Sequence, residues 1–344
     1  MVKKLDLRSD TASLPTEKMK KAMFNATLGD DILKEDPSVN ELEELAASML
    51  GMEAALFVIS GTMANQIAVM TLTERGQEVI LGPESHLYNL EVAGLAALSQ
   101  VQVRPVKVEN GCYDIDHVKE AIQEKGIQSA TTGLICLENT YNLNEGSVVP
   151  LKNMAEIKEI ADKHNIPVYL DGARLFNAAA YLGVKPSEVC QHVDAVQFCL
   201  TKGLGCPLGS ILAGPKTFIE EAKRIRQRLG GGMRQAGVIA APGIVGLTEM
   251  VDRIGEDHVT AAKLFNGLRT IPGIKPTANH FHTNIVSVEI DKDSWNADRF
   301  IEALKKYNIL VKKVGSHRVR MVTHYHIRDE DINHVVQCIQ TVME

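Results

Sequence analysis

The stretch from Pro167 to Ser210 decides which fold the chain is expected to adopt. It holds two short apolar runs, each followed by polar residues: Pro-Val-Tyr-Leu-Asp-Gly-Ala-Arg at 167–174 and Asp-Ala-Val-Gln-Phe-Cys-Leu-Thr-Lys-Gly at 194–203. Because both runs are apolar nearly throughout, they predict buried parallel strands. Asp171 ends the first run and Lys202 ends the second. Ligands of open α/β sheets bind outside the carboxyl ends of the strands, so both side chains are expected at one crevice.

This carboxylate and this amine would suit the two ends of a flat aromatic cofactor. If the strands are neighbours or next-neighbours, the two Cα atoms lie about 5–10 Å apart. Pyridoxal phosphate is held as a Schiff base by a lysine, with an acidic partner on its pyridine nitrogen. Asp171 and Lys202 are the candidates for these roles. The alternative is a solvated lysine and a chance strand-end aspartate; the uncharged residues before Lys202 and the glycine-rich turn after it favour the cofactor.

The chain is long enough for a large domain and a smaller one. It has 344 residues, of which 45% are hydrophobic, and this is ample for a sizeable core. From about residue 54 to 215 predicted strands alternate with helices, which indicates a mostly parallel sheet covered by helices. We expect an N-terminal arm at 1–14, a large cofactor-binding domain at 15–253 and a small α+β domain at 254–344.

Composition argues against several classes of partner. The net charge is −6, and acidic and basic residues are interspersed without a basic stripe, so nucleic acid is not expected. No apolar run approaches the roughly 20 residues that cross a bilayer, and the N-terminus lacks the apolar core of a signal peptide. The six cysteines show neither close pairing nor metal spacing. These features predict reduced thiols and a cytoplasmic protein.

Several polar residues follow other predicted elements. A strand at 54–59 runs into Ser60-Gly-Thr-Met-Ala-Asn65 and a helix. A helix start offers free N–H groups to an anion, so Gly61 and Thr62 are candidates for holding a phosphate, although strand-to-helix turns of this composition are common. Ser38 is the expected N-cap of a helix from Val39 to Leu50. A second helical pattern covers 88–98.

Charged and imidazole side chains provide further candidates. His86 follows a predicted strand at 78–81 and is either a loop residue or an imidazole stacked on the cofactor ring. Arg320 lies within a predicted strand, where an unpaired charge is costly, and a substrate carboxylate held in a bidentate fork would explain it. Arg234 lies in a loop just after three consecutive glycines, so it is a candidate for a contact with a phosphate or with a neighbouring subunit. Ser9 either donates a hydrogen bond in a site or belongs to an arm that packs on a neighbour.

Two His-x-His pairs raise the question of a metal site. They are His280/His282 and His324/His326. On strands, each pair would face one side, as zinc ligands do. No cysteine lies close by, and ordinary edge residues flank both pairs, so no metal is expected.

Considered together, the motifs resemble the threonine aldolase family of pyridoxal-phosphate enzymes, which has the aspartate-aminotransferase fold (fold type I). The resemblance covers essentially the whole chain, and the motifs occur in the family's order. The motifs are Asp6-Leu-Arg-Ser-Asp-Thr11, Gly29-Asp-Asp31, Ser60-Gly-Thr-Met-Ala-Asn65, Leu137-Glu-Asn-Thr140, Asp171-Gly-Ala-Arg174, Thr201-Lys-Gly-Leu-Gly205 and Gly230-Gly-Gly-Met-Arg-Gln235.

The resemblance implies a role for each matching residue. Lys202 would form the Schiff base, Asp171 would pair with the pyridine nitrogen, and His86 would stack on the ring and help position the substrate hydroxyl. Gly61 and Thr62 would hold the phosphate. The remaining roles are substrate-carboxylate binding by Ser9, Arg174 and Arg320, proximity of Arg174 to the phenolic oxygen of the ring, and contact of Arg234 with a neighbouring subunit's site. The family forms tetramers built from dimers.

The implied reaction is cleavage of L-threonine or L-allo-threonine to glycine and acetaldehyde, with the allo form expected to be preferred. This is a lyase reaction of threonine breakdown and glycine formation. Another enzyme of the fold, a β-eliminase or an aminotransferase, and a cofactor-binding protein without activity are the alternatives. One departure concerns the base: some low-specificity members carry a histidine where this chain has Gln128. The expected base is therefore His86, or a water that it holds.

Overall fold

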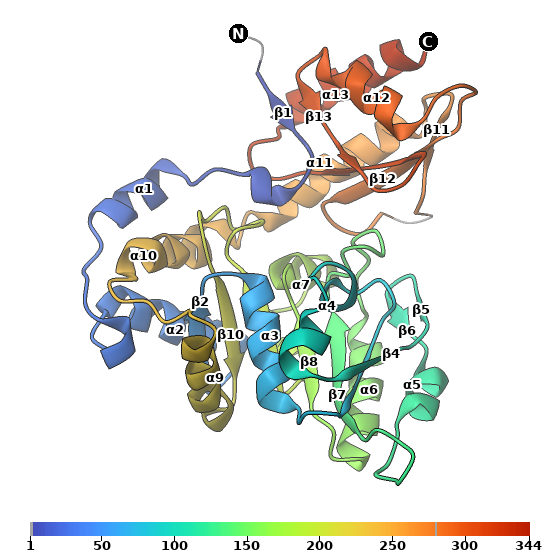
Figure 1. The fold of residues 1–344 in the computed structure, drawn as a ribbon. Helices are drawn as coiled ribbons and strands as arrows, with labels where there is room; N and C mark the ends of the chain where they lie inside the picture. The colour runs from blue at the N-terminus through green and yellow to red at the C-terminus, as the bar shows by residue number, and fades with distance from the viewer. Residues whose placement is uncertain (1–2, 279–280) are drawn as a thin grey trace.

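A seven-stranded sheet lies at the centre of the computed structural model, which describes residues 3–278 and 281–344 (Figure 1). Its strand order is β2-β10-β9-β8-β7-β3-β4. Strand β10 is antiparallel to both neighbours, and the other pairs are parallel. The mostly parallel sheet predicted from the sequence is thus confirmed. The strands are β2 (Ala54–Val58), β3 (Glu78–Leu81), β4 (Gln102–Pro105), β7 (Thr132–Glu138), β8 (Val168–Asp171), β9 (Ala195–Cys199) and β10 (Ser210–Gly214).

Helices cover both faces of this sheet because its strands are apolar on both sides. Alternate residues along β2 divide between two cores: Ala55 and Phe57 pack with α2, whereas Leu56 and Val58 pack with α3. Figure 1 shows α3 and α9 on the near face. The helices up to residue 250 are α1 (Glu17–Phe24), α2 (Pro37–Leu50), α3 (Gly61–Leu72), α4 (His86–Asn89), α5 (Ile115–Ala121), α6 (Leu151–Lys163), α7 (Leu175–Leu182), α8 (Pro186–Cys190), α9 (Lys216–Arg228) and α10 (Gly237–Val245).

Two local predictions differ from the structure. Helix α2 begins at Pro37, and its cap is Asp36, whose carboxylate accepts the Val39 N–H at 3.1 Å. The prediction of Ser38 as the cap was wrong because proline fits the first helical position and shifts the start upstream. The helix predicted over 88–98 is confirmed only at its two ends, because a turn interrupts it and a short π-helix follows at Leu95–Ser99. Helix α4 ends at Asn89, and the chain turns through Val92 and Ala93, which have positive φ.

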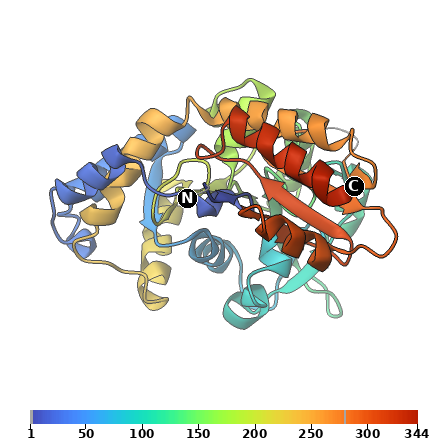
Figure 2. The same ribbon diagram turned by 90° about the horizontal axis from the view of Figure 1, so that it is seen from above.

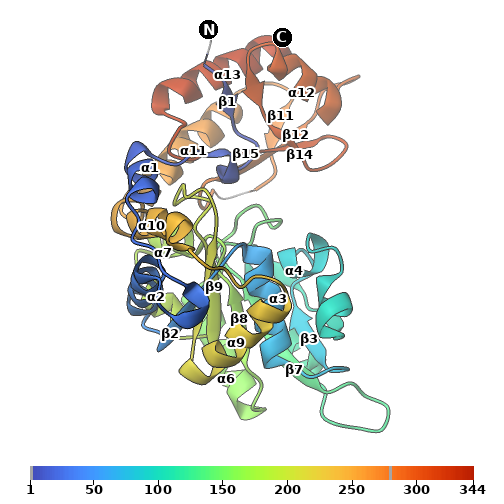
Figure 3. The ribbon, with the colours of Figure 1, turned by 60° about the vertical axis from the view of Figure 1, so that its left-hand side comes forward.

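A second, smaller unit follows α10 and a helical turn at Gly246–Met250. It contains a four-stranded sheet in the order β11-β12-β15-β14, and α12 and α13 lie on the side of this sheet away from the large unit (Figures 1 and 3). Its elements are α11 (Ile254–Leu268), β11 (Ile274–Pro276), β12 (Ile285–Ile290), α12 (Ala297–Lys305), β13 (Ile309–Leu310), β14 (Lys312–Lys313), β15 (Arg318–Val322) and α13 (Asp329–Met343). The expected domain boundary at 253/254 falls at the start of α11 and stays a prediction.

The N-terminal segment joins the two units. Strand β1 (Leu5–Asp6) pairs in parallel with β13, and Leu5 and Leu7 belong to the core of the C-terminal unit. Seen from above, the segment then runs across the middle of the molecule (Figure 2). After a short turn at Asp10–Ala12, it continues to α1, which packs against α10. Residues 7–14 are thereby placed between the two sheets.

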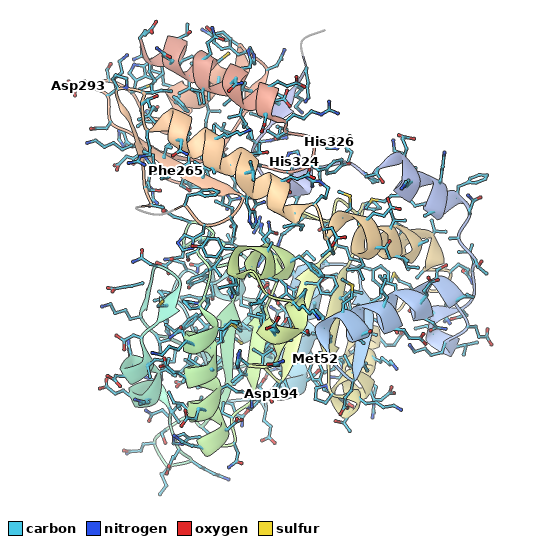
Figure 4. All side chains as sticks on the ribbon, turned by 180° about the vertical axis from the view of Figure 1, so that it is seen from behind. Met52, Asp194, Phe265, Asp293, His324 and His326 are labelled. Atoms are coloured by element: carbon cyan, nitrogen blue, oxygen red, sulfur yellow. The ribbon has the colours of Figure 1, made fainter. Side chains whose placement is uncertain are left out.

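The second histidine pair holds this segment in place. His324 donates from Nε2 to the Asp6 carbonyl at 2.9 Å, and His326 Nε2 accepts the Leu14 N–H at 3.1 Å. Figure 4 shows both rings where the C-terminal unit meets the N-terminal segment. In the first pair, His282 Nδ1 accepts the Val148 N–H at 3.4 Å, and His280 lies outside the described residues. These contacts give His282, His324 and His326 structural roles.

A small hairpin of β5 (Val108–Glu109) and β6 (Cys112–Tyr113) completes the fold.

Within residues 3–278 and 281–344, every helix is too short or too polar to traverse a bilayer.

Candidate active site

A cavity of about 200 Å³ opens at the carboxyl ends of β7, β8 and β9. It lies where parallel strands of an α/β sheet leave room for a ligand. The cavity brings together six of the candidates from the sequence: Gly61, Thr62, His86, Asp171, Arg174 and Lys202. Further side chains in its wall are Ser60, Asn65, Glu138, Thr140, Asn142, Ala173, Gln197, Cys199 and Thr201.

Asp171 is a buried carboxylate held by three donors. Strand β8 pairs with β9 so that Asp171 faces Gln197. One carboxylate oxygen accepts the Gln197 side-chain amide at 2.5 Å and the Ala173 N–H at 3.1 Å, and the other accepts the Asn65 amide at 2.8 Å. These three hydrogen bonds fix the orientation of the carboxylate in the wall of the cavity.

Lys202 lies three residues beyond the end of β9, which is the immediate neighbour of β8. The prediction that the two strands are close is therefore confirmed. The Lys202 Nζ is 3.5 Å from the Cys199 Sγ, and within the described part of the chain it forms no salt bridge with a carboxylate. The amine is thus available to react with an aldehyde in the cavity.

The start of α3 forms another wall. Ser60 caps this helix by accepting the Met63 N–H at 3.1 Å, so the first turn presents Gly61 and Thr62 to the cavity. A Cβ on residue 61 would come within 2.7 Å of the Cys199 sulfur. Glycine is therefore required for the close approach of α3 to β9. The positive end of the helix dipole and the Thr62 hydroxyl suit a phosphate.

His86 begins α4 at the mouth of the cavity. Its backbone N–H donates to the buried Glu138 carboxylate at 2.7 Å, and its ring Nδ1 lies 2.8 Å from Glu91 Oε1. Burial by itself would lower the pKa of His86. The hydrogen bond to Glu91 and the charges of Asp171, Glu91 and Glu138 outweigh burial, and the pKa is raised above its usual value.

Glu138 ends β7 directly beside Asp171. Burial and the neighbouring Asp171 charge raise the pKa of Glu138 to about 8. Its two oxygens accept the N–H groups of His86 and Asn142 at 2.7 and 2.8 Å. Glu138 therefore fixes the backbone of two loops that line the cavity.

A cluster of guanidinium groups lies on the side of the cavity that faces the C-terminal unit. Arg174 binds Asp10 through Nε at 2.6 Å and Nη2 at 2.8 Å. Asn142 Oδ1 accepts from Arg174 at 3.2 Å and from Arg320 at 3.0 Å. Burial would raise the pKa of Asp10, but the pair with Arg174 holds it far below its usual value.

Arg320 is the cation of this cluster that has no carboxylate partner among the described residues. It is buried, and its Nε has no hydrogen-bond partner in the described part of the chain. Burial and repulsion from Arg174 lower the pKa of Arg320 to about 10. An unpaired buried guanidinium is unfavourable, so the site is ready to accept an anion.

Arg320 lines an adjoining cavity that shares Asn142 with this one, and the remaining candidates also lie outside the cavity wall. Ser9 contacts Asp10 and Thr11, and this places it beside the arginine cluster. Arg234 is exposed and pairs with Asp30 at 3.0 Å, away from its own cavity. Gln128 precedes the amino end of β7, whereas the cavity lies at the carboxyl end. A residue at position 128 is therefore remote from the site of its own chain.

Several residues of this site had no role in the sequence-based hypothesis. Most lie inside the motifs that carried the resemblance, because Asp10, Asn65 and Glu138 all belong to them. Asn142 follows such a motif by two residues. The sequence shows these residues as polar positions within the motifs. It does not show their hydrogen-bond partners, because those come from distant parts of the chain. Glu91 lies in a stretch that predicted a helix and gave no signal.

These residues fit pyridoxal phosphate. A buried carboxylate, a free amine and a helix start with a glycine cradle surround one cavity. They match the pyridine nitrogen, the aldehyde and the phosphate of this cofactor. The orphaned Arg320 Nε provides in addition a place for the carboxylate of an amino acid.

Comparison with known proteins identifies the family of the chain. The model of the β-eliminating lyase family matches residues 6–291. A probable low-specificity L-threonine aldolase 2 of Arabidopsis thaliana is 40% identical over 99% of this chain and 98% of its own. The chain also resembles a threonine aldolase structure from Leishmania major, with a TM-score of 0.84, 16% identity, and coverage of 99% and 100%.

The fold is shared more widely. A serine palmitoyltransferase structure with bound pyridoxal phosphate has a TM-score of 0.77 at 18% identity, and covers 98% of this chain and 87% of its own. At this identity the likeness shows the fold alone. The family model and the relative from Arabidopsis thaliana, which matches over nearly its full length, show the family as well. The chain therefore belongs to the β-eliminating lyase family of pyridoxal-phosphate enzymes, together with the low-specificity L-threonine aldolases.

Proposed function

We propose that the chain cleaves L-threonine and L-allo-threonine to glycine and acetaldehyde. One observation carries the proposal: the Lys202 amine, the Asp171 carboxylate and the unpaired Arg320 guanidinium surround a small cavity and its immediate margin. These groups supply the chemistry that a pyridoxal-phosphate enzyme needs to hold its cofactor and an amino acid. The relatives named above support the reaction type.

Cofactor binding is assigned to the walls of the cavity. Lys202 would hold the aldehyde carbon, and Asp171 would keep the pyridine nitrogen protonated. The first turn of α3, with Gly61 and Thr62, would hold the phosphate. Bound pyridoxal phosphate supplies an electron sink for the pair left on Cα when the bond to Cβ breaks.

Substrate orientation is assigned to the arginine cluster. Asp10 neutralises Arg174 and accepts from two of its nitrogens. Among the described residues, Arg320 has one side-chain hydrogen bond, to Asn142. We therefore assign the bidentate contact with the substrate carboxylate to Arg320. Arg174 and Ser9 lie next to this position and complete the carboxylate site. Holding the carboxylate here and the amino group near Lys202 would fix the orientation of the substrate about Cα.

Proton transfer is assigned to His86. Its Nδ1 is engaged by Glu91, and its Nε2 has no hydrogen-bond partner among the described residues. Nε2 would accept the proton of the β-hydroxyl group, and the Cα–Cβ bond would then break to release acetaldehyde. Return of a proton to Cα completes glycine.

The test is aldehyde release measured side by side on the four threonine stereoisomers. Acetaldehyde and glycine in equal amounts are expected from L-threonine and L-allo-threonine, with the allo form faster. The two D isomers are expected to be inert because the carboxylate and amine contacts fix one configuration at Cα. Ammonia with a keto acid would instead indicate a β-eliminase or an aminotransferase. No product and no spectral change of the cofactor would indicate a binding protein.

We also propose that the enzyme is a homotetramer. Large apolar side chains are exposed along residues 14–33, among them Phe24 at 91% and Leu33 at 63%. Such a surface suits burial against another copy of the chain. Arg234 pairs with Asp30 within this region, which supports its proposed contact with a neighbour's site.

The expected solution mass by light scattering is that of four chains, and a dimer is expected to persist on dilution. A monomer with full aldolase activity would contradict the assembly. We further propose a cytoplasmic location, which the six free cysteines support, since reduced thiols are typical of that compartment.

A further inference from the structure

Glu91 is a buried carboxylate that the proposed reaction does not itself use. It follows α4, and its side chain is fully inaccessible to solvent. One oxygen accepts the Asn65 amide at 2.7 Å and lies 2.8 Å from His86 Nδ1, and the other accepts the Gln66 amide at 2.6 Å. The Glu91 carboxylate thus links the His86 imidazole to Asn65 and Gln66 of α3.

The backbone after Glu91 is strained. Val92 has φ 52° and Ala93 has φ 56°, in the left-handed region that a β-branched residue such as valine rarely enters. Such a conformation is unfavourable and persists where surrounding contacts over-determine it. The contacts here are those of Glu91. The chain therefore bears strain in order to place this carboxylate under His86.

The orientation of the Asn65 amide fixes the direction of the hydrogen bonds in the cluster. Its Oδ1 accepts the Tyr169 hydroxyl at 2.7 Å, so its NH₂ group must face the carboxylates of Glu91 and Asp171. Glu91 therefore accepts an amide donor on each of its two oxygens. The remaining bond to His86 is then complete when the imidazole carries its proton on Nδ1.

We propose that Glu91 is a positioning residue, which holds His86 as the Nδ1–H tautomer and leaves Nε2 free to accept the proton of the substrate hydroxyl. The inference rests on the proposed function, since it concerns the proposed base. A carboxylate that orients an imidazole in this way also stabilises its charged form. Through Asn65, the same carboxylate is linked to Asp171 at the other end of the cofactor site.

The charges that face His86 determine in which direction its pKa changes when the Glu91 charge is removed. They are Glu91 after α4, Glu138 at the end of β7 and Asp171 at the end of β8. All three favour the imidazolium form, and of these three carboxylates Glu91 is the one that hydrogen-bonds the ring. Removing the Glu91 charge is therefore expected to lower the pKa of His86 and to increase the neutral fraction at acidic pH.

The experiment measures acylation of His86 by diethyl pyrocarbonate in the cofactor-loaded enzyme without substrate. The reagent reacts with neutral imidazole, and peptide mapping isolates the signal of His86 from the other histidines. In Glu91→Gln the midpoint of the pH–rate curve is expected to fall by about one unit, which corresponds to about fivefold faster acylation at pH 6. An unchanged midpoint would overturn the proposal. Because no turnover is needed, this result is independent of whether the enzyme cleaves threonine.

Kinetics give the second readout. In Glu91→Gln, kcat is expected to fall about 10- to 100-fold, the loss typical when a partner that orients an imidazole is removed. The acid limb of the kcat/KM profile should move to lower pH, and KM should change less than about threefold. A lower kcat with an unmoved acid limb would mean that Glu91 is merely structural.

Matched variants complete the design. Glu120→Gln removes an exposed carboxylate on α5 and is expected to leave both curves in place. If Glu91→Gln does not fold, Glu91→Asp carries the test, because its shorter side chain keeps the charge and loses reach. Its acylation midpoint is expected between that of the wild type and one unit below it; a midpoint equal to that of the wild type would again overturn the proposal.

Discussion

Replacing Lys202 with alanine is expected to abolish aldehyde release from L-threonine and to remove the visible absorption of the bound cofactor. The amine lies at the cavity without a carboxylate partner among the described residues, 3.5 Å from the Cys199 sulfur. Among residues 3–278 and 281–344, no other lysine lines this cavity. The covalent link to the cofactor aldehyde would have no substitute, and turnover is expected to fall by at least about 10⁴-fold, as for an essential nucleophile.

Two variants separate the possible reasons for such a loss. Lys202→Arg keeps a positive charge but cannot condense with an aldehyde at neutral pH, so it should be as inactive as the alanine variant. Lys152→Ala, at an exposed position of α6, should retain full turnover and absorption. Addition of a small primary amine is expected to restore part of the activity of Lys202→Ala. A Lys202→Ala enzyme that keeps its visible band and its turnover would refute the assignment.

The sequence was sufficient to predict the sheet because its strands are buried on both faces. The runs that end in Asp171 and Lys202 are apolar nearly throughout. A strand buried on both faces has this pattern whichever strands lie beside it, so it can be predicted from the local sequence. The family resemblance then implied the fold type. The structure confirms that β8 and β9 are adjacent, which is what brings the carboxylate and the amine to one cavity.

The sequence was not sufficient where tertiary contacts outweigh local preference. The pattern at 88–98 favours a helix, yet the chain leaves α4 at Leu90 because the Glu91 carboxylate binds His86, Asn65 and Gln66. Those three partners lie on α3 and α4, and a window of neighbouring residues cannot reveal them. Helical propensity is weak enough for such contacts to override it.

The pairing of Arg174 shows the same limit for a charged residue. The residues next to Arg174 in the sequence do not indicate that two of its nitrogens will donate to Asp10, which lies far away in the N-terminal segment. Only the fold reveals which arginine of the cluster lacks an anion. Asp10 neutralises Arg174, whereas the Nε of Arg320 has no partner among the described residues, and the proposed division of roles between the two arginines follows from this.

Replacing Arg320 with alanine is expected to lower kcat/KM for L-threonine by about 10²- to 10³-fold. This range corresponds to about 3–4 kcal/mol, within the usual cost of losing one partner of a buried, hydrogen-bonded charge pair. The loss should appear mainly as a higher KM, because the guanidinium holds the carboxylate before and during bond cleavage. Arg320→Lys should recover only part of the rate, since a point charge cannot form the bidentate contact.

Arg318 provides the control on the same strand. It lies two residues away on β15, is exposed, and pairs with Glu145 at 2.7 Å. Arg318→Ala is expected to change kcat/KM for L-threonine by less than about threefold, as is usual for an exposed ion pair. A loss in Arg318→Ala as large as that in Arg320→Ala would point to a general field effect of the basic strand.

The sharpest form of the test changes the substrate and the enzyme together. L-Threoninamide has the shape of L-threonine but lacks the negative charge that Arg320 is proposed to bind. The wild-type enzyme should prefer L-threonine over the amide by a factor close to the loss seen in Arg320→Ala, whereas that variant should discriminate less than about tenfold. Because the comparison is made within each enzyme, an effect of the substitution on folding cancels. If Arg320→Ala kept the full preference for the free carboxylate, the contact would have to be reassigned to Arg174 and Ser9.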